Sequence, residues 1–529
     1  MLEYLQITPK ESCITVLFIL IETAMQTLSA AILAQLLDNA AKQNISLTFW
    51  LFFLNAIVFG VFLLFRYLSM KFRIYTVQRM VKEYRKVVIN QISDSDVISF
   101  TQKSKGAYVS SLTNDAKLVE SNAFDAFFAI VESVSLVSFS AIALLNFHPL
   151  LMAVTLFFSV LILIIPNSNH IKNILQIAQN RLSKANEQYT TTVSDLIAGY
   201  IDLFQQNRQL LFLSCADNAS ELLKNQTVTS GCTINRIEFL VTLLNVISQL
   251  SVVFVTVLLV LHGAVSAGTL LSVGQLSGNI FNHLDTISST VTKVQSVHEL
   301  LNCKNSHKGL KSAEEIAACD SISLRGVNYA YDCHSVFHSP INFTIELGKK
   351  YAIVGRSGAG KSTLVNILCG NYPDYQGSIL VGNTELRNLD RNRLHNFMIL
   401  MRQDPHLFSF SVEDNIFLGA SHHPEDLKNI LDACALTDVI RALPQGADTV
   451  LNPGKIQLSG GQQQRLLLAR VLASGCPVII LDEPTSSQDK ETGFAIENQL
   501  LRSPDLTVVM ITHHMNPVLA DYFDGILEI

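Results

Sequence analysis

Six long apolar stretches occupy the N-terminal half of this 529-residue chain. They cover residues 14–37, 49–70, 123–145, 150–165, 239–261 and 264–280. Each approaches the roughly 20 residues that a helix needs to cross the hydrocarbon core of a bilayer. The whole chain is only 16% charged, whereas a soluble domain carries about 25% charged residues. The sequence therefore predicts a membrane α-helical bundle of six transmembrane helices.

The polar segments between these stretches predict the orientation of the bundle. Segments 71–122 and 167–238 are long and helical in pattern, and both contain many lysines and arginines. Positively charged segments favour the cytoplasmic side of a membrane. We therefore expect both segments and both chain ends in the cytoplasm.

The C-terminal part of the chain has a different pattern, in which short β-rich runs alternate with helical runs. Strands are expected at 351–354, 378–381 and 478–481. This alternation is typical of an α/β domain built on a parallel sheet. The domains expected are a transmembrane domain at 1–303, a polar linker at 304–320 and an α/β domain at 321–529. The net charge of −6 offers no basic surface for nucleic acid.

A glycine-rich loop follows the first of these strands and precedes a helical pattern, which is the context of a phosphate-binding loop (Walker A). Its residues are Gly355, Arg356, Ser357, Gly358, Ala359, Gly360, Lys361, Ser362 and Thr363. Glycines let backbone N–H groups close around phosphate oxygens, and the helix N-terminus adds positive charge. We expect Lys361 to hold the β and γ phosphates of ATP and Ser362 to bind Mg²⁺. The sequence thus predicts an α/β P-loop NTPase domain.

The strand at 478–481 ends in two carboxylates, Asp482 and Glu483, as in a Walker B motif. Asp482 can hold Mg²⁺ through water, and Glu483 can polarise the water that attacks the γ phosphate. A strand that ends in Asp-Glu is weak support when it stands alone. Downstream of a phosphate-binding loop it indicates ATP hydrolysis.

The stretch 458–462 reads Leu-Ser-Gly-Gly-Gln and precedes a helical pattern at 463–473. With the two motifs above, it resembles the signature of the ABC exporter half-transporters. In that family the signature of one ATPase domain faces the ATP held by another domain. The resemblance therefore implies that Ser459, Gly460, Gly461 and Gln462 contact ATP across a dimer interface. The partner is expected to be a second half-transporter, in a homodimer or in a heterodimer with a related chain.

Other residues resemble the same family in order along the chain. Tyr331 matches the ring that stacks on adenine, for which Tyr329 is the alternative. Gln403 matches the Q-loop glutamine at the magnesium site, and Asp489 matches the D-loop aspartate. His513 matches the switch histidine that contacts the γ phosphate. The resemblance thus implies Mg²⁺ ligands at Ser362, Gln403 and Asp482, with Glu483 and His513 as catalytic residues.

Two departures from the family pattern stand out. Pro453 occupies the position where exporters commonly carry a glutamate that touches the coupling helices, which places coupling through that contact in doubt. The D-loop at 486–489 reads Ser-Ser-Gln-Asp and lacks the usual Ala-Leu pair, a change that bears on how the two ATP sites communicate.

Ionisable residues also lie within the apolar stretches. Glu22 and Gln26 share one helix face, Glu132 lies in the third stretch, and Arg66 lies near the inner end of the second. Charges at membrane depth usually face a cavity or one another. One reading makes Glu22 and Glu132 part of a path for a cationic or hydrogen-bonding substrate. The reading we favour has Glu132 outside lipid or paired with a neighbour, and Arg66 reaching towards the membrane surface.

The resemblance implies a multi-pass integral membrane protein that uses ATP to export a peptide, lipid or hydrophobic compound by alternating access. A bacterial inner membrane is expected, with the ATPase domain in the cytoplasm and membrane lipid around the helices. Two alternatives stay open: an importer of a metal chelate or small molecule built on the exporter fold, and a non-transporting ATPase sensor or regulator. The apolar helices do not identify the substrate.

Overall fold

The computed structural model describes residues 2–95, 97–103, 105–164, 168–301, 319–331, 334–356, 358–403, 406–452, 458–512 and 517–529. The chain divides into two compact units. The membrane unit comprises residues 1–94 and 103–305, and the ATPase unit comprises residues 95–102 and 306–529. Nearly all of the linker expected at 304–320 lies outside the described residues.

The membrane unit is helical throughout its described part. Its α-helices are α1 (Leu2–Ile7), α2 (Pro9–Ala41), α3 (Ile45–Ser93), α5 (Lys105–Ser110), α6 (Ala116–Val119), α7 (Asp125–Phe147), α8 (Pro149–Ile164), α9 (Asn169–Ala198), α10 (Tyr200–Gln205), α11 (Gln209–Leu261), α12 (Thr269–Ser296) and α13 (His298–Leu301). Two π-helical segments, Ser111–Asp115 and Glu120–Phe124, join α5, α6 and α7.

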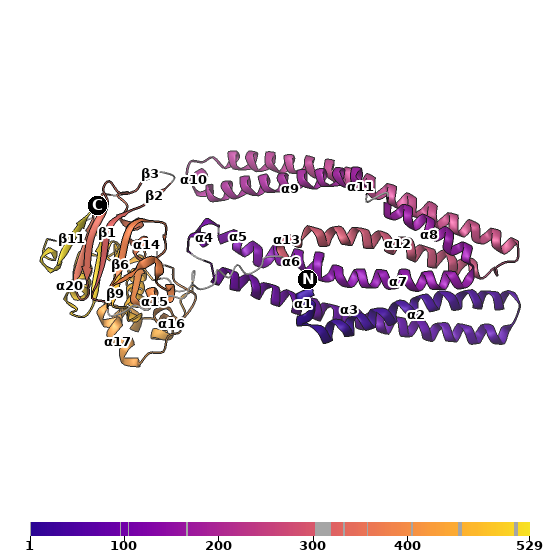
Figure 1. Ribbon diagram of the computed structural model, residues 1–529, viewed down its shortest axis with the longest axis horizontal. Coiled ribbons are helices and arrows are strands. Elements are labelled where there is room, and N and C mark those ends of the chain that lie inside the picture. The colour runs from indigo at the N-terminus through magenta and orange to yellow at the C-terminus, as the bar shows by residue number, and fades with distance from the viewer. Residues whose placement is uncertain are drawn as a thin grey trace. The chain divides into compact units, whose positions relative to one another are not determined.

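The longest helices continue well beyond the apolar stretches. Helix α3 has 49 residues and α11 has 53. At 1.5 Å per residue each is roughly 75 to 80 Å long, whereas the hydrocarbon core of a bilayer is about 30 Å thick. The polar segments expected to be helical are therefore largely continuations of membrane helices into water. In Figure 1, α2 runs beside α3 and α9 runs beside α11, in agreement with their contacts.

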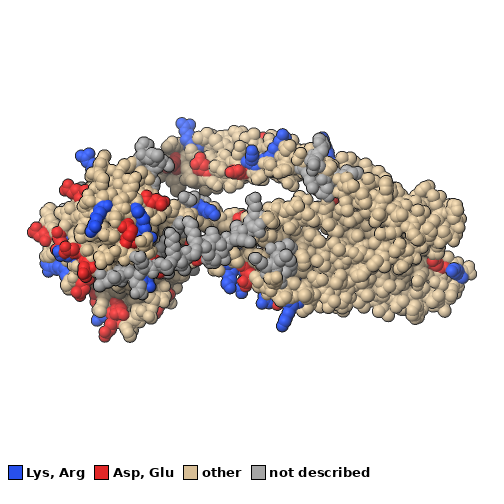
Figure 2. Space-filling model, viewed as in Figure 1, with Lys and Arg blue, Asp and Glu red and all other residues tan. Residues whose placement is uncertain are grey.

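Four helical segments of the described chain are long and apolar enough to cross a membrane: Pro9–Ala41, Ile45–Ser93, Lys105–Phe147 and Gln209–Leu261. Helix α8 is apolar but has 16 residues, and α12 has a larger share of polar residues than any of the four. These two helices lie where the other two spans are expected, so the number six stays a prediction. Figure 2 shows few charged residues on the right-hand part of the membrane unit, over the apolar ends of α2, α3 and α7, as lipid contact requires.

The ATPase unit holds the strands. They are β1 (Ser321–Asn328), β2 (Ala330–Tyr331), β3 (His334–Ser335), β4 (Ile341–Glu346), β5 (Lys350–Val354), β6 (Gln376–Val381), β7 (Thr384–Glu385), β8 (Met398–Met401), β9 (Val478–Asp482), β10 (Thr507–Ile511) and β11 (Gly525–Glu528). Its α-helices are α4 (Val97–Gln102), α14 (Lys361–Leu368), α15 (Arg391–Phe397), α16 (Val412–Phe417), α17 (Pro424–Ala433), α18 (Thr437–Arg441), α19 (Gly460–Ala473) and α20 (Lys490–Arg502).

The strands form a five-stranded parallel sheet in the order β11-β5-β10-β9-β8 and a four-stranded antiparallel sheet in the order β4-β1-β6-β7. Strands β2 and β3 pair separately. The strand expected at 378–381 lies in the antiparallel sheet, so its expected place in the parallel sheet was wrong. Its residues pair with β1, a partner that local sequence does not reveal.

Side chains on β9 alternate between two hydrophobic cores. Val478 and Ile480 pack with the antiparallel sheet and α14, whereas Ile479 and Leu481 pack with α16, α19 and α20. Successive side chains of a strand point to opposite faces, so a strand covered on both faces is apolar throughout. The parallel sheet is therefore the middle layer of the ATPase unit, and its carboxyl edge is held rigidly from both sides.

Candidate functional site

Several of the predicted nucleotide residues follow strands that end at one edge of the parallel sheet. Strands β5, β8, β9 and β10 are parallel, so their carboxyl ends lie at the same edge. Ile511 at the end of β10 pairs with Asp482 on one side and Ile353 on the other. The glycine-rich loop, Gln403 and Glu483 follow these strands directly or within two residues. Segments nearly 130 residues apart in the sequence thus come together at a single edge.

The glycine-rich loop has a conformation that only glycine adopts readily. Gly358 and Gly360 have φ angles of +82° and +97°, and a Cβ on Gly360 would lie 2.7 Å from the Val336 side chain. The Lys361 ammonium donates to the carbonyl oxygens of Gly355 at 2.9 Å and Arg356 at 3.0 Å. The loop therefore curls around its own lysine at the N-terminus of α14, which fits a phosphate group.

We expect Gly360→Ala to destabilise the ATPase unit by about 1–3 kcal/mol, because a non-glycine residue at this φ is strained and its Cβ would collide with Val336. ATP affinity should fall in the same variant. Thermal unfolding and equilibrium ATP binding measure the two effects. The control for the unfolding measurement is Gly460→Ala, whose Cβ would meet nothing within 4 Å. Equal unfolding temperatures for the two variants would contradict the expectation.

Glu483 sits in an unusual backbone conformation, with a φ of +51°. Its N–H donates to the carbonyl of Ile511 at 3.2 Å, and its own carbonyl accepts the side-chain amide of Gln464 at 2.7 Å. The Glu483 carboxylate accepts a hydrogen bond of 3.2 Å from the side-chain amide of Gln403. The structure thus brings together two predicted site residues, Gln403 and Glu483, and fixes the glutamate backbone on both sides.

The donor set proposed for magnesium has the right chemistry. Ser362 lies in the first turn of α14, Asp482 ends β9, and Gln403 follows β8. All three offer oxygen atoms, which Mg²⁺ prefers in nucleotide sites. These residues fit a magnesium ion beside a triphosphate.

The predicted signature residues form the N-terminus of α19. Ser459 caps the helix: its side chain accepts from the Gln462 N–H at 3.3 Å, and its own N–H donates to the Gln462 side chain at 2.9 Å. Gly460 faces open space, since an added Cβ would meet no atom within 4 Å. A helix N-terminus with exposed N–H groups attracts anions, so this end suits the phosphates of a nucleotide.

Asp489 is the N-cap of α20, where its carboxylate accepts the Thr492 N–H at 2.9 Å. This hydrogen bond holds the pKa of Asp489 below its ordinary value. The carboxylate is therefore charged at neutral pH and starts the helix that follows the D-loop.

The structure gives only the backbone position of the predicted residue Tyr331, and two other predicted residues, Ser357 and His513, lie outside the described residues. Tyr331 lies in β2, paired with His334, and its stacking on adenine stays a prediction. The alternative, Tyr329, stacks on Tyr372 with ring centroids 5.4 Å apart, so one face of its ring is covered. The departure at Pro453 also lies outside the described residues.

The comparisons with known proteins agree with both units. The model of the ABC transporter transmembrane region matches residues 12–284, and the ABC transporter model matches residues 338–486. The chain belongs to the ABC transporter family. One transmembrane region and one ATPase region are fused in the chain, as predicted. This ABC transporter is therefore an integral membrane protein with an ATP-binding domain.

Three relatives illustrate the range of the family. The transport/processing ATP-binding protein ComA of Streptococcus pneumoniae is 30% identical over 50% of this chain. The chain spans only 38% of ComA. The ATP-dependent lipid A-core flippase of Sodalis glossinidius is 25% identical, covering 94% of this chain and 88% of the relative. A bacterial Atm1-family ABC exporter solved with ATP bound has a TM-score of 0.82 at 20% identity, covering 98% of this chain and 93% of the other.

Within the membrane unit, the ionisable residues of the apolar stretches are paired. Arg66 donates to the Glu22 carboxylate at 2.9 Å, and Ser69 donates to its other oxygen at 2.6 Å. Arg66 thus pairs with a buried carboxylate on the adjacent helix while its own side chain stays 47% exposed, and its reach towards the membrane surface stays a prediction. Glu132 lies 3.7 Å from Arg73, which agrees with the pairing reading.

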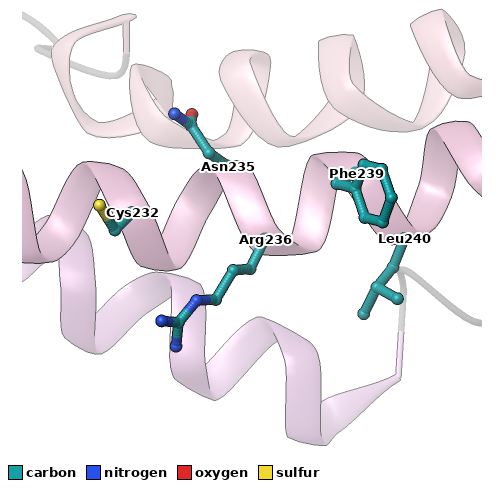
Figure 3. Close-up of a pocket in the computed structure, with 5 residues that line it drawn as sticks. All are labelled: Cys232, Asn235, Arg236, Phe239 and Leu240. Atoms are coloured by element: carbon teal, nitrogen blue, oxygen red, sulfur yellow. The ribbon is translucent and has the colours of Figure 1, made fainter.

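A groove of about 500 Å³ lies along α11 and is lined by Cys232, Asn235, Arg236, Phe239 and Leu240. Figure 3 shows Asn235 on the opposite side of the helix from Arg236 and Leu240. The groove lies where the apolar stretch of α11 begins, and no sequence motif pointed to it. The guanidinium of Arg236 lies in a mainly apolar lining. Such a lining would suit a molecule with one anionic and one apolar part.

Proposed function

We propose that this ABC transporter uses ATP hydrolysis to export a peptide, lipid or hydrophobic compound across a bacterial inner membrane. The observation that carries the proposal is the convergence of the phosphate-binding loop, Gln403 and Glu483 at one sheet edge, in a chain that also contains a transmembrane bundle. The domains proposed are a transmembrane domain at 1–303, a linker at 304–320 and a cytoplasmic ATPase domain at 321–529.

Each site residue has a chemical role in the proposed hydrolysis. Lys361 and the loop N–H groups hold the β and γ phosphates, and Glu483 takes a proton from the attacking water. Bound Mg²⁺ offsets negative charge on the phosphate oxygens, and Ser362, Gln403 and Asp482 would hold it. His513 is proposed to contact the γ phosphate, and Tyr331 is proposed to stack on adenine.

The proposed unit of function is a dimer. In this family, ATP binds between two ATPase domains. One domain contributes the loop that corresponds to 355–363, and the other domain contributes the signature that corresponds to 459–462. The chain carries one copy of each, so a second half-transporter has to complete each site. The partner is a second copy of this chain or a related chain.

One relative supports the lipid class among the substrates proposed. One relative is named for transport and processing, and another is named as a lipid A-core flippase. Both names describe those proteins, and both are bacterial. The flippase name supports a lipid substrate for this chain, and the peptide class rests on the resemblance of its motifs to the exporters.

The test compares strains that carry the wild type or Glu483→Gln, with small molecules, lipids and peptides measured in medium and cells. Export predicts a compound that is lost from the medium and retained in the cells of the variant. A compound left in the medium and depleted in the cells would instead demonstrate import. Identical profiles for the two strains would overturn transport as the function.

A further inference from the structure

The segment that carries Glu483 is hydrogen-bonded to the first turns of α19 at both of its ends. The Gln464 amide on α19 donates to the Glu483 carbonyl at 2.7 Å and the Ser486 hydroxyl at 3.3 Å, and its oxygen accepts the Ser487 N–H at 3.2 Å. Gln464 is only 4% exposed. One buried side chain therefore uses its donor and acceptor groups to hold the same short loop.

Gln488 makes a second connection in the opposite direction. Its amide donates to the carbonyl of Gly461 at 2.7 Å. The contact is close, since a Cβ on Gly461 would lie 2.9 Å from the carbonyl oxygen of Ser487 and 3.0 Å from the Gln488 side chain. Gln488 is also one of the D-loop positions at which this chain departs from the Ala-Leu pair of its family. The departure thus supplies a polar side chain that the usual leucine lacks.

The backbone of Glu483 needs such support. A non-glycine residue with positive φ is strained and persists only where its surroundings determine its position. At Glu483 the N–H donates to the Ile511 carbonyl, and the Glu483 carbonyl accepts the Gln464 amide at 2.7 Å, the Ser486 N–H at 3.3 Å and the Ser486 hydroxyl at 3.2 Å. Of these contacts, only the hydrogen bond from Gln464 reaches Glu483 from α19.

We propose that Gln464 and Gln488 are positioning residues that couple the signature end of α19 to the carboxylate of Glu483 within one chain. Gly461 and Gln464 lie three residues apart, so one turn of helix joins the proposed nucleotide contact to the loop 483–488. A displacement of the α19 N-terminus, when nucleotide binds there, is transmitted through these amides to the backbone of the proposed general base. This inference rests on the proposed ATPase function.

Gln464→Met keeps the length of the side chain and removes all three hydrogen bonds, and Gln488→Leu removes one. We expect the kcat of ATP hydrolysis to fall about fivefold in Gln488→Leu, because one hydrogen bond is lost. In Gln464→Met we expect kcat to fall more than tenfold, because several hydrogen bonds are lost. KM for ATP should stay within about twofold, because neither side chain belongs to the proposed nucleotide contacts. Steady-state kinetics on purified full-length protein measures both.

The Glu483→Gln background separates positioning from a general structural role. If Gln464 acts through the Glu483 carboxylate, Gln464→Met should cause no further loss of single-turnover hydrolysis once that carboxylate is gone. The control variant is Gln463→Met, whose amide donates to the Leu458 carbonyl at 2.8 Å instead of the 483–488 loop. It should keep the wild-type kcat within about twofold.

The coupling is overturned if Gln464→Met retains the wild-type kcat, or if it lowers hydrolysis by the same factor with and without the Glu483 carboxylate. It is also overturned if KM rises as much as kcat falls. These outcomes differ from failure of the proposed function, which a wild-type protein without any ATPase activity would show.

Discussion

The Glu483→Gln variant is expected to lose ATP turnover by a factor of about 10² to 10⁴, the usual contribution of a general base, while ATP binding changes by less than about twofold. Glutamine keeps the size of the side chain and an oxygen that can still accept from Gln403, which lies 3.2 Å away. The backbone hydrogen bonds of residue 483 do not involve the substituted group. The fold of the loop should therefore be unchanged.

Phosphate release and equilibrium ATP binding on the purified transporter measure the two quantities. The matched control is Glu491→Gln, at an exposed carboxylate in the first turn of α20. It should alter stability by only a few tenths of a kcal/mol, of the order expected for a charge at a helix N-terminus, and should retain turnover. Wild-type turnover in Glu483→Gln would remove Glu483 from the mechanism.

Local motifs predict the chemistry of the site from residues that are adjacent in sequence. The loop at 355–363 contains its own glycines, lysine and helix start, so its phosphate-binding pattern lies within nine neighbouring residues. The same holds for the cap formed by Ser459 and Gln462. Family membership and the two kinds of unit were predicted from these patterns and are confirmed by the comparisons.

Contacts between distant segments could not be predicted in the same way. The strand at 378–381 joins the antiparallel sheet because β1 is available as its partner, more than 50 residues earlier in the chain. The amide of Gln464 reaches a carbonyl 19 residues away only after α19 and β9 have packed. The sequence did show that Gln488 belongs to a D-loop that departs from the family pattern. The structure shows that this side chain donates a hydrogen bond to Gly461.

The pairing of charged residues in the membrane unit also could not be predicted from local sequence. Arg66 and Glu22 lie 44 residues apart, and each alone is simply an ionisable residue in an apolar helix. Their pairing depends on how α2 packs against α3, which the apolar sequence does not determine, because many side-chain combinations pack equally well in lipid. Packing turns two costly charges into one hydrogen-bonded pair.

Removing Arg66 is expected to destabilise the membrane unit by about 3–5 kcal/mol, the cost of leaving a buried charge without its partner. The Glu22 side chain is only 4% exposed, whereas that of Arg66 is 47% exposed. Glu22→Ala should therefore cost clearly less than Arg66→Ala, because the arginine left behind can turn to solvent or lipid headgroups. The Ser69 hydrogen bond of 2.6 Å can offset only part of the charge that remains on Glu22.

Reversible unfolding in detergent micelles measures both variants and the double variant Glu22→Leu/Arg66→Met. An apolar replacement of a buried ion pair is often neutral, so the double variant should be more stable than Arg66→Ala. That order follows from the unequal burial of the two partners. Equal losses for the two single variants would show that the pair does not shield Glu22, and would return the carboxylate to the reading in which it faces a substrate path.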